Sequence, residues 1–385
     1  MKRQNFNSDD EFLIWVFENR EQWSTWQRVV DFINAELEIN KSERWARRKC
    51  IELLKLSPDD YQDYQREIAK KVNQKQRASL NKHFNEIASN RYQIEELTRA
   101  IRETERLPIP EFKDKPKKQG KIEWLLAFGD IHYGKKFKSI TNEYSPFICK
   151  NRMSTIISSL IPIFAKESIG KLKVLTMGDL IEGETLRPGQ NKRLESDYGI
   201  INQTIEFQRI LAAWLNELSR SVDIDYCAVK RSNHSQIRPQ GSKDTDYDDE
   251  DIERLIHAYI EALLENNKSI IINTDDKVHT QFDIAGFKCL AIHGHKNKSY
   301  DINLLKDYSF KYWQLFDYAF IAHTHSYSLT ASGENKNGNC QTIRVPSVMG
   351  SDEYADELLV GSKPGALLMG FEKNVGKVIT YELYL

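Results

Sequence analysis

The segment Trp124-Leu-Leu-Ala-Phe-Gly-Asp-Ile-His132 decides the fold of this chain. Its apolar run, Trp124–Phe128, is followed at once by a glycine and then by Asp130 and His132. A short apolar run that ends at glycine is typical of a strand buried on both faces, and such strands belong to sheets covered by helices. Ligands of open α/β sheets bind where the strands end. Asp130 and His132 are therefore candidate functional residues.

Four further apolar runs end in polar residues of the same kinds. They are Leu172–Met177 before Gly178-Asp179, Asp225–Val229 before Ser232-Asn233-His234, Cys289–Ile292 before His293-Gly-His295, and Tyr318–Ile321 before Ala322-His323-Thr-His325. Helices are expected between several of these runs, at Arg152–Lys166, Ile200–Leu218, Asp251–Leu264 and Leu304–Leu315, and late strands at Gln341–Val345 and Lys377–Leu383. The alternation of strand and helix predicts an α/β fold.

The polar residues after these strands suit two divalent metal ions. Carboxylate and neutral imidazole are ligands that borderline divalent metals accept. Alternate residues that leave a strand point the same way, so Asp130 and His132 can reach one ion together. The Asp179 carboxylate can bridge two ions, and the Asn233 carbonyl oxygen is a weaker, neutral ligand. The His-x-His pair after Tyr318–Ile321 can divide between the two ions.

The order Asp-x-His, Gly-Asp, Asn-His, His-Gly-His, His-x-His resembles the calcineurin-like metallophosphoesterase superfamily, over about residues 121–385. The resemblance implies a four-layer fold with two β-sheets sandwiched between helices. It also implies a full set of metal ligands, with Asp130, His132 and His325 on one ion, Asn233, His293 and His323 on the other, and Asp179 between them. His234 would be the catalytic histidine that is not a ligand.

Three positions depart from the pattern of this superfamily. Ser232 and Ala322 stand where the superfamily usually has glycine before Asn-His and before His-x-His. Both replacements are small. His295 is an additional histidine, and we expect it to lie behind the ligands or to face solvent.

The resemblance implies hydrolysis of a phosphoester. Two ions about 3.5–4 Å apart lower the pKa of water from about 15.7 toward 7, so that hydroxide attacks phosphorus, and they stabilise charge on the phosphate oxygens. His234 would protonate the leaving alkoxide. Manganese is the first expectation for a site of mixed nitrogen and oxygen ligands, while iron, zinc, nickel and magnesium stay open.

The bulk composition fits a cytoplasmic protein of two or three domains. The chain has 385 residues, of which 40% are hydrophobic and 29% charged, as in ordinary globular proteins. A net charge of −1 gives no general attraction to nucleic acid, so any basic surface must be local. The five cysteines are scattered, which fits a reducing compartment. We see no signal sequence and no apolar stretch of about 20 residues, so no membrane partner is expected.

Residues 1–57 are expected to form a small helical domain. Helices are predicted at Asp9–Asn19, Trp26–Leu37 and Glu43–Lys55, with Ser24 or Thr25 capping the second and Ser42 the third. A helix, a short turn and a basic helix form the outline of a helix-turn-helix module. In that case the third helix would contact DNA through Arg44, Arg47, Arg48 and Lys49. A plain three-helix bundle with a solvated basic face is the alternative.

Residues 58–106 are expected to form a long helical arm. This segment lacks proline and glycine, and Leu80, Ile87, Ile94 and Ile101 recur at seven-residue steps. The arm could dock on the rest of the chain or form an intermolecular coiled coil, which would make a homo-oligomer. Residues 107–120 contain three prolines and predict an extended linker before the catalytic domain at 121–385.

Two classes of substrate stay open. A phosphodiesterase acting on DNA is favoured by the basic third helix and by the basic loop 187–193, which contains Arg187, Lys192 and Arg193, because such patches attract backbone phosphates. The arrangement also resembles phage phosphoesterases of the DNA-repair exonuclease type. The alternative is a phosphatase of a small molecule or protein, with the helical region as a docking arm. The acidic loop Asp244–Asp251 would repel a polyanion if it faced the site, or it could cap the next helix.

Overall fold

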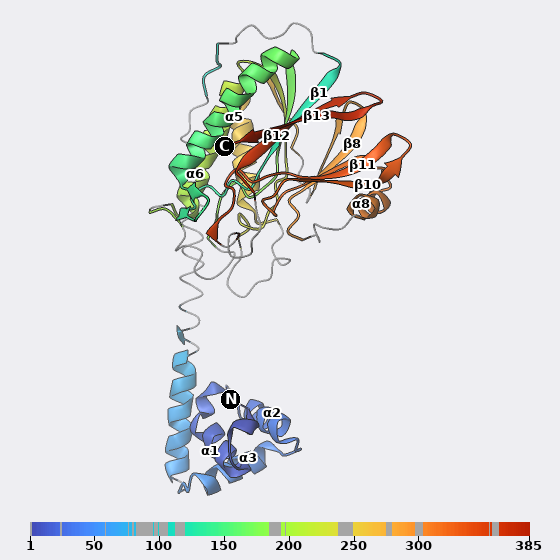
Figure 1. Ribbon diagram of the computed structural model, residues 1–385. Helices are drawn as coiled ribbons and strands as arrows, with labels where there is room; N and C mark the ends of the chain where they lie inside the picture. The colour runs from blue at the N-terminus through green and yellow to red at the C-terminus, as the bar shows by residue number, and fades with distance from the viewer. Residues whose placement is uncertain are drawn as a thin grey trace. The chain divides into compact units, whose positions relative to one another are not determined.

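The computed structural model describes residues 2–23, 25–57, 59–75, 77–78, 81, 95, 99, 107–111, 120–184, 194–196, 198–237, 249–274, 279–296, 303–353, 355 and 362–385. The chain divides into two compact units, Met1–Glu95 and Glu96–Leu385 (Figure 1). The seven-residue repeat of the arm, the basic loop 187–193 and most of the linker lie outside the described residues. Among the helices that are described, none is long and apolar enough to cross a membrane.

The first unit is a bundle of three helices, α1 (Asp9–Glu18), α2 (Trp26–Leu37) and α3 (Glu43–Leu53). Short 3₁₀ turns, η1 (Arg3–Asn5) and η2 (Arg20–Gln22), lie beside α1, and residues 59–75 form a further helix. Each of the three helices begins at a hydroxyl that accepts a backbone N–H three residues ahead, and the caps are Ser8, Thr25 and Ser42. The three helices predicted from the sequence are therefore confirmed.

The core of this unit is built from side chains of all three helices. Its fully buried members include Phe12, Phe17, Val29, Ile33 and Cys50. We expect Phe12→Ala to lower the free energy of unfolding of this unit by about 3–5 kcal/mol, because the change leaves a cavity. Urea unfolding followed by tryptophan fluorescence would measure it. The exposed Phe147→Ala is the control, and an equal shift of both variants would contradict the assigned core.

The second unit contains a six-stranded sheet in the order β13-β12-β1-β4-β5-β6. Its strands are β1 (Ile122–Phe128), β4 (Lys171–Thr176), β5 (Asp223–Ala228), β6 (Ile270–Ile272), β12 (Gly365–Glu372) and β13 (Gly376–Tyr384). The strands β1, β4, β5 and β6 run parallel, while β12 and β13 run antiparallel to their neighbours. The helices α5 (Pro146–Glu167), α6 (Ile200–Leu218) and α7 (Ile252–Leu264) pack on one face.

A five-stranded sheet faces the other side of the first sheet, in the order β10-β11-β9-β8-β7. Its strands are β7 (Thr280–Ile284), β8 (Phe287–Ile292), β9 (Tyr318–Ile321), β10 (Ser328–Asn335) and β11 (Gly338–Arg344). A short hairpin is formed by β2 (Phe137–Lys138) and β3 (Glu143–Tyr144). The helix α8 (Leu304–Tyr312) covers part of the outer face of the second sheet (Figure 1).

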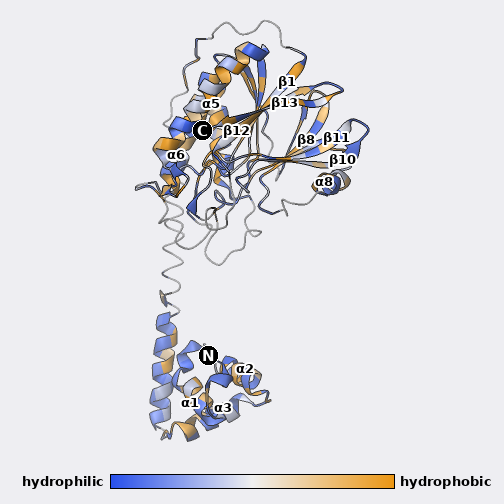
Figure 2. Cartoon of the chain, in the orientation of Figure 1, coloured by the Kyte–Doolittle hydropathy of each residue, from blue (hydrophilic) through white to orange (hydrophobic). Residues whose placement is uncertain are grey.

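Burial on both faces explains why the central strands are apolar throughout. In β1, Trp124 and Leu126 pack toward the helices α5–α7, whereas Leu125 and Ala127 pack between the two sheets. The strands β8 and β9 alternate in the same way between the inter-sheet core and α8. In Figure 2 apolar residues accordingly lie along these strands. The order helix, sheet, sheet, helix confirms the four-layer α/β fold.

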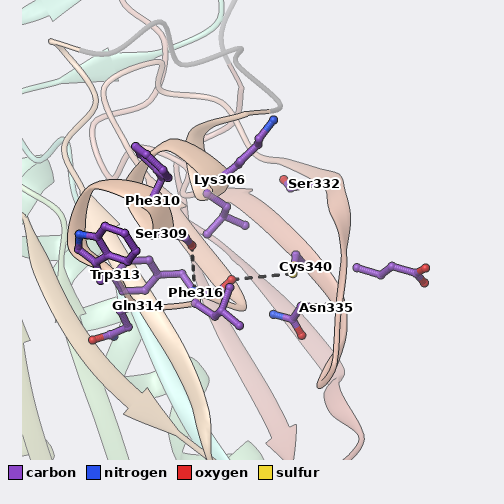
Figure 3. A pocket seen from close by; sticks show the side chains of 12 residues that line it. Lys306, Ser309, Phe310, Trp313, Gln314, Phe316, Ser332, Asn335 and Cys340 are labelled. Carbon is purple, nitrogen blue, oxygen red and sulfur yellow. Dashed lines mark hydrogen bonds between the residues drawn. The ribbon is translucent and has the colours of Figure 1, made fainter.

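The helix α8 covers only part of the outer face of the second sheet. Beside α8 lies a hollow of about 560 Å³ between the helix and strands β10 and β11 (Figure 3). Phe310 and Trp313 on its rim are 76% and 90% exposed. None of the predicted metal ligands lines this hollow.

Candidate metal centre

The predicted ligands follow the carboxyl ends of strands in both sheets. Asp130 follows β1, Asp179 follows β4 and Asn233 follows β5, three neighbouring parallel strands. His293 follows β8 and His323 follows β9, which are also parallel neighbours. Because the two sheets face each other, their polar ends meet at one place, and the structure brings all seven predicted ligands together there.

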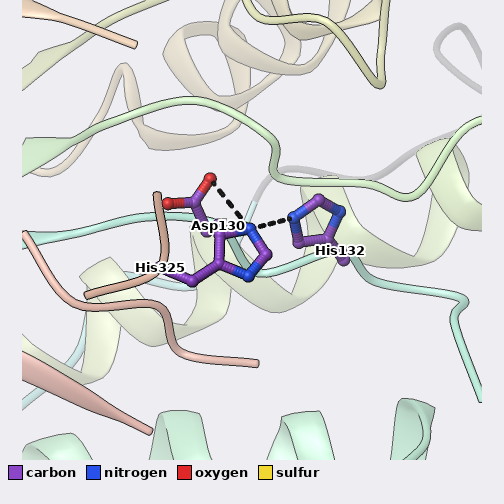
Figure 4. Close-up of side chains that lie close together, drawn as sticks. All are labelled: Asp130, His132 and His325. Atoms are coloured by element: carbon purple, nitrogen blue, oxygen red, sulfur yellow. Dashed lines mark hydrogen bonds and ion pairs between the residues drawn. The ribbon is translucent and has the colours of Figure 1, made fainter. Parts of the chain in front are cut away.

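The first ligand group consists of Asp130, His132 and His325, whose potential ligand atoms all lie within 4.8 Å of one another. Their side chains point toward a common centre (Figure 4). The Nε2 atoms of His132 and His325 are 3.2 Å apart, and Nε2 of His325 lies 3.7 Å from Oδ1 of Asp130. These are the three residues that the resemblance assigned to one ion.

The second ligand group contains Asp179, His293 and His323 within the same limit. The Nε2 atom of His293 lies 3.0 Å from Oδ2 of Asp179 and 2.9 Å from Oδ1 of Asn233. The same Asp179 oxygen lies 3.8 Å from Nε2 of His132 in the first group. Asp179 thus stands between the two groups, as a bridging carboxylate would.

The side chains at the site suit divalent cations because buried carboxylate oxygens and imidazole nitrogens face one another. Oδ1 of Asp130 and Oδ2 of Asp179 are buried and have no hydrogen-bond partner among the described residues. The Nδ1 atom of His293 donates to the Met177 carbonyl at 3.0 Å. Nε2 of His293 therefore faces the Asp179 oxygen, and when it is unprotonated it presents a lone pair that a metal ion could take. A cation between such acceptors satisfies them, so these groups can hold divalent metal.

The backbone at the ligands has an uncommon conformation. Among the described non-glycine residues with positive φ are five of the predicted ligands, Asp130, His132, Asp179, His323 and His325, with φ between 46° and 66°. This left-handed region is rare for non-glycine residues, and strained residues gather at functional sites. Hydrogen bonds hold the turns in place, since the N–H groups of Ile131 and His132 both donate to the Asp179 carbonyl at 2.9 Å.

Two glycines keep the loops close together. Gly178 has φ of +88°, and a Cβ there would lie 3.0 Å from Nδ1 of His293. Gly183 has φ of +69°, and a Cβ there would lie 2.0 Å from the His234 carbonyl oxygen. Only glycine permits these approaches, which bring the β4 loop against the loops of His293 and His234.

Glu182 is a residue of the candidate site that the sequence analysis did not identify, and with His132 and His234 it forms a third group whose potential ligand atoms lie within 4.8 Å of one another. Its buried carboxylate oxygen Oε2 lies 2.9 Å from Nδ1 of His132 and 3.2 Å from Nδ1 of His234. Burial alone would raise the pKa of Glu182, but Lys135 and the two imidazoles hold that pKa well below its usual value. A carboxylate that accepts Nδ1–H of His132 leaves the Nε2 lone pair free for a metal. In the sequence, Glu182 stands three residues after Asp179, and nothing else along the chain distinguishes it from other glutamates.

Glu182→Gln should weaken metal binding and activity by about 10- to 100-fold each, the usual effect of removing a carboxylate that orients a metal-bound histidine. Titration with Mn²⁺ by calorimetry and hydrolysis of a chromogenic phosphodiester would measure both. Glu206→Gln, which alters a carboxylate on α6, is the control. Unchanged metal affinity in the Glu182 variant would contradict this role.

The predicted catalytic residue His234 also lies at the site. His234 donates its backbone N–H to Oδ1 of Asp179 at 3.0 Å, and its Nδ1 is 3.1 Å from the Glu182 carbonyl oxygen. Its ring packs edge-on against His132 with centroids 4.4 Å apart. His295 lies behind His293, with ring centroids 5.4 Å apart. The replacement Ala322 is fully buried between the sheets.

The basic residues of α3 differ in their surroundings. Arg44 and Arg48 are exposed. Arg47 pairs with Glu43 and lies 5.2 Å from the Trp26 ring centroid. Lys49 pairs with Glu52 at 2.9 Å and with Asp10 at 3.5 Å. Two of the four predicted DNA contacts are thus held in ion pairs within the unit, while Arg187, Lys192 and Arg193 lie outside the described residues.

Two facing sheets between helices, with Asp, Asn and His side chains after five strands, form the layered α/β fold expected from the sequence and place one candidate site for divalent metal at the ends of the strands. No family model matches the chain. In sequence, the chain is 34% identical over 402 residues to the SPbeta prophage-derived uncharacterized protein YonJ of Bacillus subtilis strain 168, with 100% of this chain and 98% of YonJ covered. The chain therefore belongs to the YonJ family.

Solved structures with low sequence identity are also similar to about two thirds of the chain. Vps29 of Entamoeba histolytica complexed with zinc is 14% identical, with 68% of this chain and 98% of Vps29 covered and a TM-score of 0.31. A predicted phosphoesterase of Streptococcus pneumoniae TIGR4 is 10% identical, with 69% and 98% covered and a TM-score of 0.26.

Proposed function

We propose that the protein is a two-metal phosphodiesterase that cleaves DNA. The observation that carries the metal chemistry is the pair of buried carboxylate oxygens on Asp130 and Asp179 that face histidine nitrogens, Nε2 of His325 at 3.7 Å and Nε2 of His293 at 3.0 Å. One ion would be held by Asp130, His132 and His325, the other by Asn233, His293 and His323, with Asp179 shared. Manganese is the proposed metal, since the ligands mix nitrogen and oxygen.

Bound ions of this kind activate water as a nucleophile and neutralise charge on a phosphate. The chain itself supplies the orientation and the proton. Glu182 fixes the ring orientations of His132 and His234 through their Nδ1 atoms. His234 is the residue that would give a proton to the leaving oxygen. His234 lies beside both ligand groups but was not itself predicted as a ligand, and its proposed role is compatible with this position.

DNA as substrate is supported by two features. Arg44 and Arg48 lie four residues apart on α3, on one exposed helix face, after the turn that follows α2. Such a face can follow a phosphate backbone or enter a major groove. The relative YonJ is described as prophage-derived, and a nucleic-acid substrate is compatible with that origin.

The direct test compares four substrates with the Mn²⁺-loaded protein: bis-p-nitrophenyl phosphate, p-nitrophenyl phosphate, linear DNA and circular DNA. We expect cleavage of the diester and of DNA, and cleavage of circular DNA would mark endonuclease action. Good turnover of the monoester with no cleavage of any DNA would overturn the nuclease proposal and favour a phosphatase.

Arg44→Ala combined with Arg48→Ala should weaken DNA binding and flatten its dependence on salt. Each lost phosphate contact lowers the slope of log K against log salt by about 0.9, so we expect a decrease of about 2 for the double variant. Fluorescence anisotropy at several salt concentrations would measure the slope. The double change Lys306→Ala with Lys311→Ala removes equal charge from α8 as a control, and an unchanged slope for the α3 variant would contradict DNA contact there.

A further inference from the structure

A buried cluster of hydroxyl and carboxyl groups lies behind the metal-site loops, outside both ligand groups. It contains Ser232 and Ser235, which flank the Asn-His pair, and Asp251 and Glu253 at the start of α7. All four residues are buried, and Ser235 and Glu253 are fully so. Ser232 is one of the positions where the chain departs from the glycine of the resembling superfamily.

The cluster holds the loop after β5 at several points. The Ser232 N–H donates to Oδ2 of Asp251 at 3.0 Å, and the Ser232 hydroxyl donates to Oε1 of Glu253 at 2.8 Å. The Ser235 hydroxyl donates to Oδ1 of Asp251 at 2.6 Å, and the two serine hydroxyls are 2.7 Å apart. The Ile252 N–H also donates to the Ser235 carbonyl at 3.1 Å. The segment that carries Asn233 is thus anchored on both sides.

The same glutamate also reaches the loop after β4. Oε1 of Glu253 accepts the N–H of Leu180 at 3.1 Å, and Leu180 directly follows Asp179. A single carboxylate oxygen therefore joins the loop of the bridging carboxylate to the loop of Asn233. His234 also contacts the loop after β4 directly, because its N–H donates to Oδ1 of Asp179 at 3.0 Å and its Nδ1 lies 3.1 Å from the Glu182 carbonyl oxygen.

Helix capping alone does not explain this arrangement. Asp251 already caps α7, because its side chain accepts the Glu253 N–H at 3.0 Å. This is the capping role considered for the acidic loop, shown for its last residue, while residues 244–248 lie outside the described residues. The side chain of Glu253 is not needed for the cap. Its second oxygen, Oε2, is buried without a hydrogen-bond partner among the described residues, which costs stability. Such a cost is tolerated where a polar group has a function at a site.

We propose that Glu253 and Asp251 are positioning residues that keep Asn233 in register with Asp179, through the hydroxyls of Ser232 and Ser235. The inference rests on the metal site of the proposed function. Asn233 is a ligand of the second ion only. The first group keeps its own anchors, including the bonds from the Ile131 and His132 N–H groups to the Asp179 carbonyl. Loss of the cluster should therefore affect the second ion selectively.

The test compares Mn²⁺ binding by the full-length protein and its Glu253→Ala variant. Calorimetry should show the second ion bound about 10- to 100-fold more weakly, as for other residues that support metal ligands, with the first ion within about threefold of wild type. Electron paramagnetic resonance at two equivalents should show a spin-coupled manganese pair in the wild type and isolated Mn²⁺ in the variant.

Three further variants separate positioning from general stability. Glu253→Gln keeps a carbonyl oxygen that accepts from Leu180 and Ser232, and it should restore second-ion affinity to within about threefold of wild type. Trp214→Phe removes a buried bond from Trp214 Nε1 to the Met153 carbonyl at 2.7 Å, and it should change neither affinity. If Glu253→Ala does not fold, Ser232→Ala serves in its place, with a loss of about tenfold for the second ion.

The outcomes distinguish this inference from the proposed function. Wild-type affinity for the second ion in the alanine variants, or equal weakening of both ions, would overturn the positioning role even if DNA is cleaved. A wild-type protein that binds fewer than two ions would overturn it as well. Selective loss of the second ion, together with no DNA cleavage by the wild type, would support the positioning role and overturn the nuclease proposal.

Discussion

Asp179→Asn is expected to lower phosphodiester hydrolysis by on the order of 10³-fold or more. The substitution keeps an oxygen that can accept the His234 N–H, now 3.0 Å from Asp179 Oδ1, but it removes the charge shared between the two ligand groups. Metal ions stabilise such transition states by several kcal/mol, and each 1.36 kcal/mol corresponds to a factor of ten in rate.

The measurement is the rate of bis-p-nitrophenyl phosphate hydrolysis at saturating Mn²⁺, with metal content determined on the same sample. Asp317→Asn is a matched control, because Asp317 is also a buried aspartate but accepts hydrogen bonds from Lys288 and Asn335 in the second sheet. The control should retain activity. Full activity in the Asp179 variant would contradict the assignment of the bridging ligand.

His234→Gln is expected to lower cleavage of DNA by about 10²- to 10⁴-fold, the usual contribution of a general acid, while both metal ions stay bound. Burial of the imidazole disfavours its charged form, but Asp179 and Glu182 nonetheless raise the pKa of His234 above its ordinary value. The loss should be much smaller for bis-p-nitrophenyl phosphate, because p-nitrophenolate leaves without needing a proton.

The comparison of the two substrates is the measurement for His234. His257→Gln is the matched control, since His257 is buried on α7 and its Nδ1 lies 3.2 Å from the Tyr226 hydroxyl, outside the ligand groups. That variant should cleave both substrates like the wild type. An equal loss on both substrates in the His234 variant would contradict a role as general acid and point to a positional role.

The sequence predicted the strands of the site well because each is buried on both faces. A strand such as β9 (Tyr318–Ile321) must be apolar throughout, and its polar successors then stand out. The same reasoning should have found β12 (Gly365–Glu372), which is almost entirely buried.

Helix α5 begins at Pro146, six residues before the predicted start, because Ser145 caps it and proline is favoured in the first turn.

Features that depend on tertiary contacts could not be derived from patterns along the chain. Glu182 is distinguished from other glutamates only by its burial against His132 and His234. Arg47 is one arginine among several in α3 until the fold places it over Trp26. In the same way, Ser232 reads as a small substitute for glycine, whereas its hydroxyl is bonded within a buried cluster. The candidate metal ligands can be predicted from their spacing in the sequence, whereas the residues that support them can be identified only from the packing of the folded chain.

The most direct test of a two-metal phosphoesterase is removal and stepwise return of the metal. The protein is treated with a chelator, and Mn²⁺ is then added in known equivalents while hydrolysis of bis-p-nitrophenyl phosphate is followed. We predict no hydrolysis by the metal-free protein and a rate that rises to a plateau at two equivalents per chain. Hydrolysis that survives complete removal of metal, or none at any Mn²⁺ concentration, would contradict the account.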